Sequence, residues 1–285
     1  MIYDNVLDAV GNTPLIRLNK MTGPEDAEIL VKFEAVNIGG SVKTRTAKKM
    51  IEAAEEKGLI HPGTIIVEPT SGNQGIGLAL IGAVKGYKTK IIMPDSVSEE
   101  RRKLVKGYGA EVILVHDDGD IGACIARCME LASEMAAEDP NVYVPQQFAN
   151  EANSAAHREE TGREILEQAG KPIHGFCSGI GTGGTITGIG ETLKAANPEI
   201  EIWALEPEHA AILSGGKIGT HLQMGIGDGV IPDILNQKIY DHVLTVTDEE
   251  ALETARELAR KEGLMCGISS GTSVAGALKL ARKLG

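Results

Sequence analysis

Short apolar runs rich in β-branched residues alternate along the chain with stretches whose apolar residues recur at helical spacing. Ala47, Met50, Ile51 and Ala54 fall at positions i, i+3, i+4 and i+7, which predicts a helix with one apolar face that ends near Gly58. The apolar runs predict strands at residues 28–33, 64–67, 88–93, 112–115, 142–144, 175–177, 200–205 and 242–246. Alternation of this kind indicates the α/β class, with parallel sheets covered by helices.

Two further helices are predicted in the second half of the chain. Thr247 and Glu250 have the spacing of a capping box, which predicts a helix start there, and Gly263 follows the end of the apolar stripe. Another helix is predicted over residues 188–196, after a glycine-rich turn at 178–188.

Four loops rich in glycine and hydroxyl residues interrupt the alternation, each before a predicted helix. They lie at residues 37–43, 70–75, 178–188 and 267–271. In open parallel sheets, ligands gather in loops at the carboxyl ends of the strands, so the four loops predict one shared cleft. The turn at 178–188 is suited to an anion, because a helix start offers free backbone N–H groups.

Composition and charge narrow the class of ligand. The 285 residues include 40 acidic and 28 basic ones, and the net charge of -12 disfavours nucleic acid and anionic membranes as partners. The four cysteines have neither C-x-x-C nor zinc-ligand spacing, which predicts free thiols and no metal site. We find no signal-peptide pattern and no apolar run of membrane length, so we expect a cytoplasmic protein.

Two motifs suggest other functions. Gly267-x-Ser269-x-Gly271 matches the nucleophile elbow of serine hydrolases, but no acid or histidine follows it, as that triad requires. Gly181 belongs to a G-x-G-x-x-G pattern, and Glu206 follows at a distance typical of a dinucleotide fingerprint. The hydroxyl residues next to this glycine pattern suit a terminal phosphate better than a dinucleotide. A nicotinamide dehydrogenase is therefore only a distant alternative.

Lys43 is the candidate nucleophile. It follows Gly39, Gly40 and Ser41 at a predicted helix start, where the positive end of the helix dipole tends to lower the pKa of a lysine and favours the free amine. The alternative is an ordinary solvated lysine in a first helical turn. The surrounding motifs decide between the two.

Eight separated motifs resemble, in order and spacing, the cysteine synthase (O-acetylserine sulfhydrylase) and cystathionine β-synthase family of fold type II enzymes, which use pyridoxal 5'-phosphate (PLP). The resemblance covers nearly the whole chain. The motifs are Gly11-Asn-Thr-Pro-Leu15, Asn37-x-x-Gly-Ser-Val-Lys43-x-Arg45, Glu68-Pro-Thr-Ser-Gly-Asn73-x-Gly-Ile-Gly-Leu-Ala79, Met93-Pro-x-x-x-Ser98-x-Glu-Arg-Arg102, Gln147-Phe148-x-Asn150, Gly179-Ile-Gly-Thr-Gly-Gly-Thr-Ile-Thr-Gly188, Gly225-Ile-Gly227 and Gly267-Ile-Ser-Ser-Gly271.

The resemblance implies a role for each matching residue. Lys43 would form the Schiff base with PLP and then remove the Cα proton of the substrate, Asn73 would bond the ring oxygen of the cofactor, and Ser269 would meet its pyridine nitrogen. The phosphate would be held by Gly181, Thr182, Gly183, Gly184 and Thr185, and the substrate carboxylate by Thr70, Ser71, Gly72, Gln74 and Gln147.

The resemblance also implies the architecture. We expect an α/β protein with two domains, each a mostly parallel sheet flanked by helices, as in the tryptophan synthase β fold. A smaller mobile domain at residues 39–144 would close over the substrate, and a larger domain at 1–38 and 145–285 would bind the PLP phosphate. Relatives usually form homodimers and continue past the position of Leu284 with another strand and loop.

The implied reaction is β-replacement through an aminoacrylate, most directly O-acetyl-L-serine and sulfide to L-cysteine and acetate. Two departures from the family pattern leave the substrates open: Gln74 replaces a threonine, and Asp228 replaces an alanine. As an acid or base, Asp228 would suit sulfide-releasing conversion of cysteine to serine, cystathionine or lanthionine, or a serine-using β-synthase. It could equally cap nearby amides. A non-catalytic amino-acid-binding protein is a remote alternative. Such a protein would have no need of a Schiff-base amine, so the presence of Lys43 weighs against it.

Overall fold

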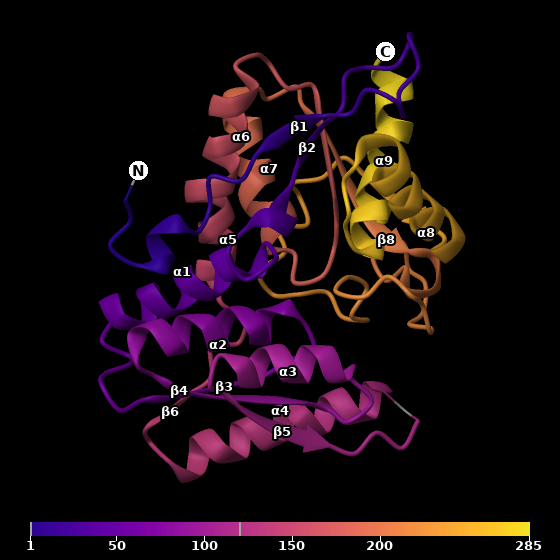
Figure 1. The fold of residues 1–285 in the computed structure, drawn as a ribbon. Helices are drawn as coiled ribbons and strands as arrows, with labels where there is room; N and C mark the ends of the chain where they lie inside the picture. The colour runs from indigo at the N-terminus through magenta and orange to yellow at the C-terminus, as the bar shows by residue number, and fades with distance from the viewer. Residues whose placement is uncertain (1, 120) are drawn as a thin grey trace. The chain divides into compact units, whose positions relative to one another are not determined.

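The computed structural model describes residues 2–119 and 121–285, which form two compact units (Figure 1). Unit 1 comprises Met1–Gly11 and Val36–Asn153, and unit 2 comprises Asn12–Ala35 and Ser154–Gly285. Each unit contains a parallel sheet with helices packed on it, so the predicted α/β class is confirmed.

Unit 1 is built on a four-stranded parallel sheet in the order β5-β4-β3-β6. Successive residues of its strands point to opposite faces: Ile66 and Ile91 pack in one core with helices α1 and α2, whereas Val67 and Ile92 pack with α4. The elements are η1 (Val6–Ala9), η2 (Glu34–Val36), α1 (Lys43–Glu56), β3 (Ile65–Pro69), α2 (Asn73–Lys85), β4 (Lys88–Pro94), α3 (Glu99–Gly107), β5 (Glu111–Val115), α4 (Ile121–Glu138) and β6 (Val142–Tyr143).

Unit 2 is built on a three-stranded parallel sheet in the order β7-β8-β9, and an antiparallel pair, β1 and β2, belongs to the same unit. One core packs α6 and α7 against the sheet, and another packs α8 and α9. The elements are β1 (Leu15–Arg17), β2 (Leu30–Lys32), α5 (Glu151–Ala156), η3 (His157–Thr161), α6 (Gly162–Ala169), β7 (Gly175–Gly179), α7 (Gly184–Ala196), β8 (Glu201–Pro207), η4 (Glu208–Ala210), β9 (His242–Val246), α8 (Asp248–Glu257), η5 (Leu258–Glu262) and α9 (Ile268–Leu284).

Most predicted elements are confirmed, and the differences have physical reasons. Thr247 caps α8 by accepting a hydrogen bond from the Glu250 amide, and Gly263 ends the following turn with a left-handed φ of 75°. Helix α7 begins at Gly184, four residues before the prediction, because glycine and threonine in its first turn hide the helical spacing. Strand β1 was not predicted, since three residues carry too little alternation to be recognised.

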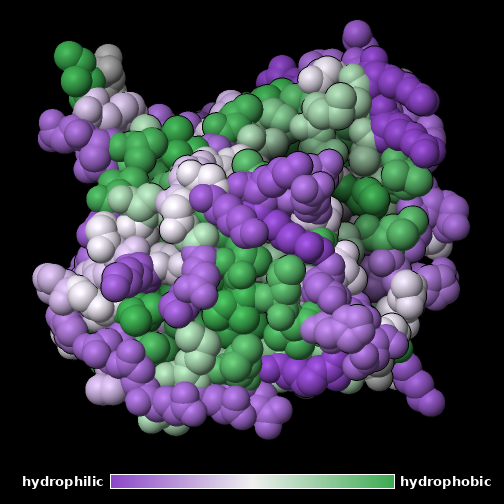
Figure 2. All heavy atoms as spheres, turned by 60° about the horizontal axis from the view of Figure 1, so that its bottom comes forward, coloured by the Kyte–Doolittle hydropathy of each residue, from purple (hydrophilic) through white to green (hydrophobic). Residues whose placement is uncertain are grey.

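One surface of unit 1 carries several exposed apolar side chains. Figure 2 brings forward the face at the bottom of Figure 1, where α3, β5 and α4 lie, and shows apolar side chains inside a border of polar ones. The large apolar residues exposed on these elements are Leu104, Tyr108, Leu114, Ile125 and Met129. Of the helices in residues 2–119 and 121–285, none has the length and apolar character needed to cross a membrane.

Candidate active site

Lys43 is the first residue of α1, as the sequence predicted, and its backbone is held from several directions. The Lys43 amide donates to Oγ of Ser41 at 3.3 Å, and the Lys43 carbonyl accepts from Oγ1 of Thr46 at 2.9 Å. A Cβ on Gly77 of α2 would lie only 2.9 Å from that carbonyl oxygen, so a glycine is needed for α2 to pack this closely. The turn that carries the lysine is therefore fixed by α2.

Gln74 links the same two helix starts. Its side chain is 1% exposed, and its Oε1 lies 2.7 Å from Oγ1 of Thr46, the residue that also bonds the Lys43 carbonyl. Within the described residues, the Nε2 atom of Gln74 has no hydrogen-bond partner. The departure from the family's threonine thus places a buried amide next to the lysine turn.

The loop before α2 has the features of a carboxylate site. Helix α2 begins at Asn73 with Gly72 as its N-cap, and no side chain caps its first N–H groups. The loop is fixed by hydrogen bonds from the Thr70 amide to the Ile92 carbonyl at 2.9 Å and from the Gly72 amide to Oγ1 of Thr70 at 3.2 Å. Arg101 donates from Nη1 to the Ser71 carbonyl at 3.1 Å. A helix start of this kind is suited to an anion, because its first N–H groups point away from the helix.

Gln147 is connected to this loop through Glu68, a residue whose role sequence reasoning missed. Glu68 is 1% exposed, and its two carboxyl oxygens accept the backbone N–H groups of Gln146 and Gln147 at 3.0 and 3.1 Å. Burial raises the pKa of Glu68 to about 7, although the two N–H donors act in the opposite direction. Sequence alone shows no pattern that joins residues so far apart.

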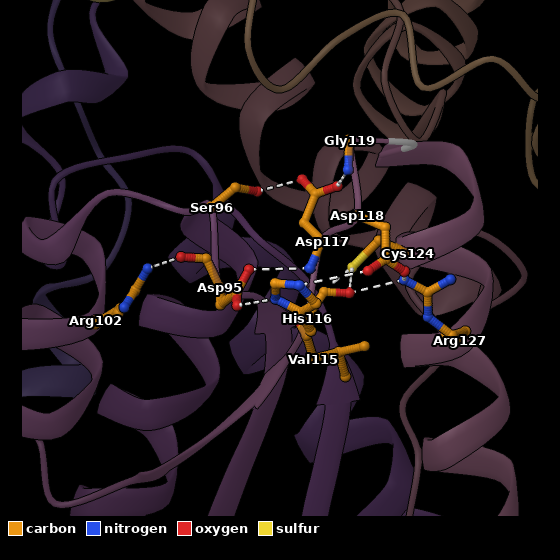
Figure 3. Close-up of polar contacts among 10 residues, drawn as sticks. All are labelled: Asp95, Ser96, Arg102, Val115, His116, Asp117, Asp118, Gly119, Cys124 and Arg127. Carbon is orange, nitrogen blue, oxygen red and sulfur yellow. Dashed lines mark hydrogen bonds and ion pairs between the residues drawn. The ribbon is translucent and has the colours of Figure 1, made fainter.

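A polar cluster fixes the loops that follow β4 and β5 (Figure 3). His116 lies 2.8 Å through Nδ1 from Oδ2 of Asp95, and the Asp117 amide donates to the other oxygen of Asp95 at 3.0 Å. Arg102, which follows Arg101 in α3, donates to the carbonyls of Asp95 and Val97. The cluster therefore helps to set the position from which Arg101 reaches the carboxylate loop.

In unit 2, the predicted phosphate loop runs from the end of β7 at Gly179 to the start of α7 at Gly184. Ile180 anchors it, because its amide donates to the Leu205 carbonyl at 2.9 Å and its carbonyl accepts from the Gly227 amide at 2.8 Å. A Cβ on Gly181 would lie 2.5 Å from the Gly225 carbonyl oxygen, so only glycine fits there. The result is a small, fixed turn at a helix start, as phosphate binding requires.

His157 supports the end of this loop and was also missed by sequence reasoning. It is 1% exposed and lies in the π-helical turn His157–Thr161, with Nε2 3.2 Å from Oγ1 of Thr185 and Nδ1 3.0 Å from Oγ1 of Thr161. π-Helical turns often occur at functional sites. This one aims a buried ring at a predicted phosphate ligand.

Asp228 lies beside the phosphate loop. Its Oδ2 atom is 3.5 Å from the position that a Cβ on Gly181 would take. A hollow is lined by Asp228, Ile180, Leu213 and Glu206, among others. Glu206 is buried and accepts the backbone N–H groups of Leu213 and Ser214, both at 2.9 Å, so it holds a loop of the protein.

Ser269 lies in the first turn of α9, which packs along β7. One turn further on, the Ser273 carbonyl accepts a hydrogen bond from Sγ of Cys177, near the carboxyl end of β7 where the phosphate loop begins. The N-cap of α9 is Gly267.

The predicted cofactor residues fall into two groups, one in each unit. The turn with Gly181 leads into α7, whose first N–H groups have no side-chain cap among the described residues, and Thr182 in this turn is buried. Lys43 and Asn73 begin α1 and α2, and so offer an amine and an amide from adjacent helix starts. Lys43 and the predicted carboxylate loop belong to unit 1, and the predicted phosphate loop and Ser269 belong to unit 2.

Fold and site together define a PLP-dependent enzyme. The family described as pyridoxal-phosphate dependent enzyme matches residues 6–285. A probable cysteine synthase of Bacillus subtilis is 45% identical over 286 residues, which cover 99% of this chain and 91% of the relative. The chain belongs to the cysteine synthase family of pyridoxal-phosphate dependent enzymes.

Solved structures of related enzymes agree with this assignment. A hydrogen sulfide-producing enzyme from Fusobacterium nucleatum has a TM-score of 0.94 at 42% identity, with 100% of this chain and 92% of that chain covered. A cysteine synthase from Entamoeba histolytica has a TM-score of 0.94 at 38% identity, with 99% and 83% covered.

Proposed function

We propose that this protein catalyses PLP-dependent β-replacement and converts O-acetyl-L-serine and sulfide into L-cysteine and acetate. The observation that carries the proposal is the packing of the Lys43 turn against α2, the helix that follows the predicted carboxylate loop. The proposed nucleophilic amine and the proposed carboxylate site would thus belong to two neighbouring helix starts. The naming of the Bacillus subtilis relative as a probable cysteine synthase supports the same substrates.

Each predicted site residue would have its own role in the reaction. PLP, when bound, withdraws electrons from the substrate Cα and stabilises the negative charge that develops there. The Thr70–Gly72 loop and Gln147 bind and orient the substrate carboxylate. Lys43 takes the proton from Cα through Nζ and returns it after sulfide has replaced acetate. The phosphate loop and Thr185 would hold the phosphate, and Ser269 would lie at the ring nitrogen.

Absorption spectroscopy and a cysteine assay test the proposal. The purified protein with PLP should show a visible absorption band and form cysteine from O-acetyl-L-serine and sulfide. Lys43→Ala should lose both, whereas Lys57→Ala, which changes an exposed lysine after the same helix, should keep both. A wild-type protein that stays colourless with added PLP and forms no cysteine would overturn the proposal.

A second candidate reaction is sulfide release from cysteine, and the position of Asp228 favours it. Its carboxylate lies beside Gly181 of the predicted phosphate loop, and as an acid or base it would act on a leaving group or an incoming nucleophile. The similar Fusobacterium nucleatum enzyme produces hydrogen sulfide. Sulfide release from cysteine alone should be much slower in Asp228→Ala than in wild type, and equal rates would exclude this role for Asp228.

We also propose an assembly and a compartment, on the basis of the family and of the cysteines. The protein would be a homodimer in a reducing compartment such as the cytoplasm, where its four free cysteines, two of them buried, stay reduced. Light scattering of the purified protein should give twice the chain mass, and a monomer would contradict the dimer.

A further inference from the structure

Glu68 stands where the two predicted carboxylate-binding segments of unit 1 meet. It precedes Pro69 and the Thr70 loop at the carboxyl end of β3. Its side chain accepts the backbone N–H groups of Gln146 and Gln147, 78 and 79 residues further along the chain. One buried carboxyl group therefore connects the loop before α2 with the segment that carries the Gln147 side chain.

The segment that Glu68 holds has an unusual backbone. Gln146 has a left-handed φ of 58°, a conformation that residues other than glycine rarely adopt. The Gln146 carbonyl accepts from the amides of Ala149 and Asn150 at 2.9 and 3.0 Å, and the Gln147 carbonyl accepts from Nδ2 of Asn153 at 2.8 Å. The carbonyl groups of Gln146 and Gln147 are thus both hydrogen-bonded within the segment, and their backbone N–H groups donate to Glu68.

The two backbone N–H groups that donate to Glu68 both need an acceptor, because they lie in a water-poor interior. An ionised carboxylate accepts through both oxygens, whereas a glutamine amide offers one acceptor and turns an NH₂ group toward the other donor. Replacing the carboxylate would therefore leave one of the two backbone N–H groups without a partner. The strained turn at Gln146 would then lose the contact that keeps it in place.

We infer that Glu68 is a positioning residue for the substrate carboxylate: it holds the Gln147 backbone so that this side chain and the Thr70 loop bind the carboxylate together. The inference rests on the proposed function, since it needs an amino-acid substrate bound at these two segments. Among the described residues, the hydrogen bonds of the buried Glu68 side chain come from these two backbone N–H groups, so Glu68 would contribute through them.

The test compares two amino-acid ligands that have no leaving group. L-Alanine has a carboxylate and L-alaninamide does not, and the binding of each to the PLP-loaded enzyme is followed by the change in visible absorption. Glu68→Gln should weaken L-alanine binding about tenfold, the effect of one lost hydrogen bond to a charged group, and should leave L-alaninamide binding unchanged. A merely structural role would weaken both ligands alike or neither.

A matched control is Glu262→Gln. One carboxyl oxygen of Glu262 accepts the backbone N–H groups of Asn19, Lys20 and Met21, in unit 2 and in a loop with no predicted ligand. Both ligands should bind this variant as they bind wild type. If Glu68→Gln does not fold, Glu68→Asp, which keeps the charge on a shorter arm, should show the same selective loss.

The outcomes separate the two hypotheses. If wild type has no visible absorption band and binds neither ligand, the proposed function is wrong. If wild type prefers L-alanine and the Glu68 variants bind both ligands as wild type does, the function stands and the role of Glu68 is wrong. Equal weakening of both ligands also overturns the role of Glu68.

Discussion

The imidazole Nε2 of His157 lies 3.2 Å from Oγ1 of Thr185, so a buried ring from a π-helical turn contacts the first turn of the helix that ends the predicted phosphate loop. The contact orients the hydroxyl of a residue that is predicted to hold the PLP phosphate. His157 would therefore affect cofactor affinity without touching the cofactor.

Two substitutions at His157 distinguish this role. The amide nitrogen of glutamine reaches the position of Nε2, whereas that of asparagine reaches only Nδ1. We expect His157→Asn to raise the PLP dissociation constant about tenfold, through loss of one hydrogen bond, and His157→Gln to change it little. Equilibrium dialysis against PLP measures both, with the exposed His174→Asn as control. Equal affinities for all three variants would contradict the contact's role.

Gly181→Ala should abolish PLP binding. The added methyl would lie 2.5 Å from the Gly225 carbonyl oxygen, so either the phosphate loop or the turn at Gly225 must move. Overpacking of this kind costs about 1–3 kcal/mol of stability. Gly107→Ala, where a Cβ meets no atom within 4 Å, is the control and should bind PLP normally. Normal PLP binding by Gly181→Ala would contradict this prediction and show that the turn can shift to accommodate the methyl group.

Glu68 should make the stability of the protein fall as the pH rises. Its folded pKa of about 7 exceeds its ordinary value of 4.5, so between these values the folded state binds more protons than the unfolded state. Stability is then highest below pH 4.5 and decreases until the pH passes about 7, by roughly 3 kcal/mol. Urea unfolding at pH 5 and pH 7.5 should show this trend in wild type relative to Glu68→Gln. A constant difference between the two proteins would refute it.

The pair of His116 and Asp95 should stabilise unit 1 in a limited pH range. The hydrogen bond to Asp95 raises the pKa of His116 above 6.5, and the same bond lowers the pKa of Asp95 below 3.8. The stabilisation is complete between these two values, disappears as the pH rises through the pKa of His116, and also disappears as the pH falls through that of Asp95. NMR titration of His116 should give a pKa above 6.5 that Asp95→Asn lowers, and an unchanged value would exclude the pair.

Local patterns predicted most of the fold. The strand at His242–Val246 and the helix start at Lys43 follow from alternation and from helical spacing within a few residues. The π-helical turn at His157 could not be predicted, because it inserts a residue into an otherwise regular helix without a sequence signature. The start of α7 was placed too late, because Gly184 and Thr185 are poor helix formers that tertiary contacts hold in a helix.

The candidate site was predictable only where its residues are neighbours in sequence. The glycine loop and the Thr70 loop are contiguous motifs, and the structure places each at a helix start. Glu68 and Arg101 act through contacts with residues 79 and 30 positions away, so no local pattern reveals them. The role of Asp228 stays a prediction, supported by its place beside Gly181.

The hydrogen bonds that hold the backbone of the two predicted carboxylate-binding segments have a consequence for enzyme engineering. Glu68, Arg101 and Asn153 fix the backbone through bonds to main-chain atoms, so the shape of these segments depends little on the side chains that would face a substrate. Variation at Gln147, a residue predicted to bind the substrate, can therefore change which amino acid is accepted while the loops keep their form. The same separation of scaffold from specificity would let related enzymes acquire new substrates through few mutations.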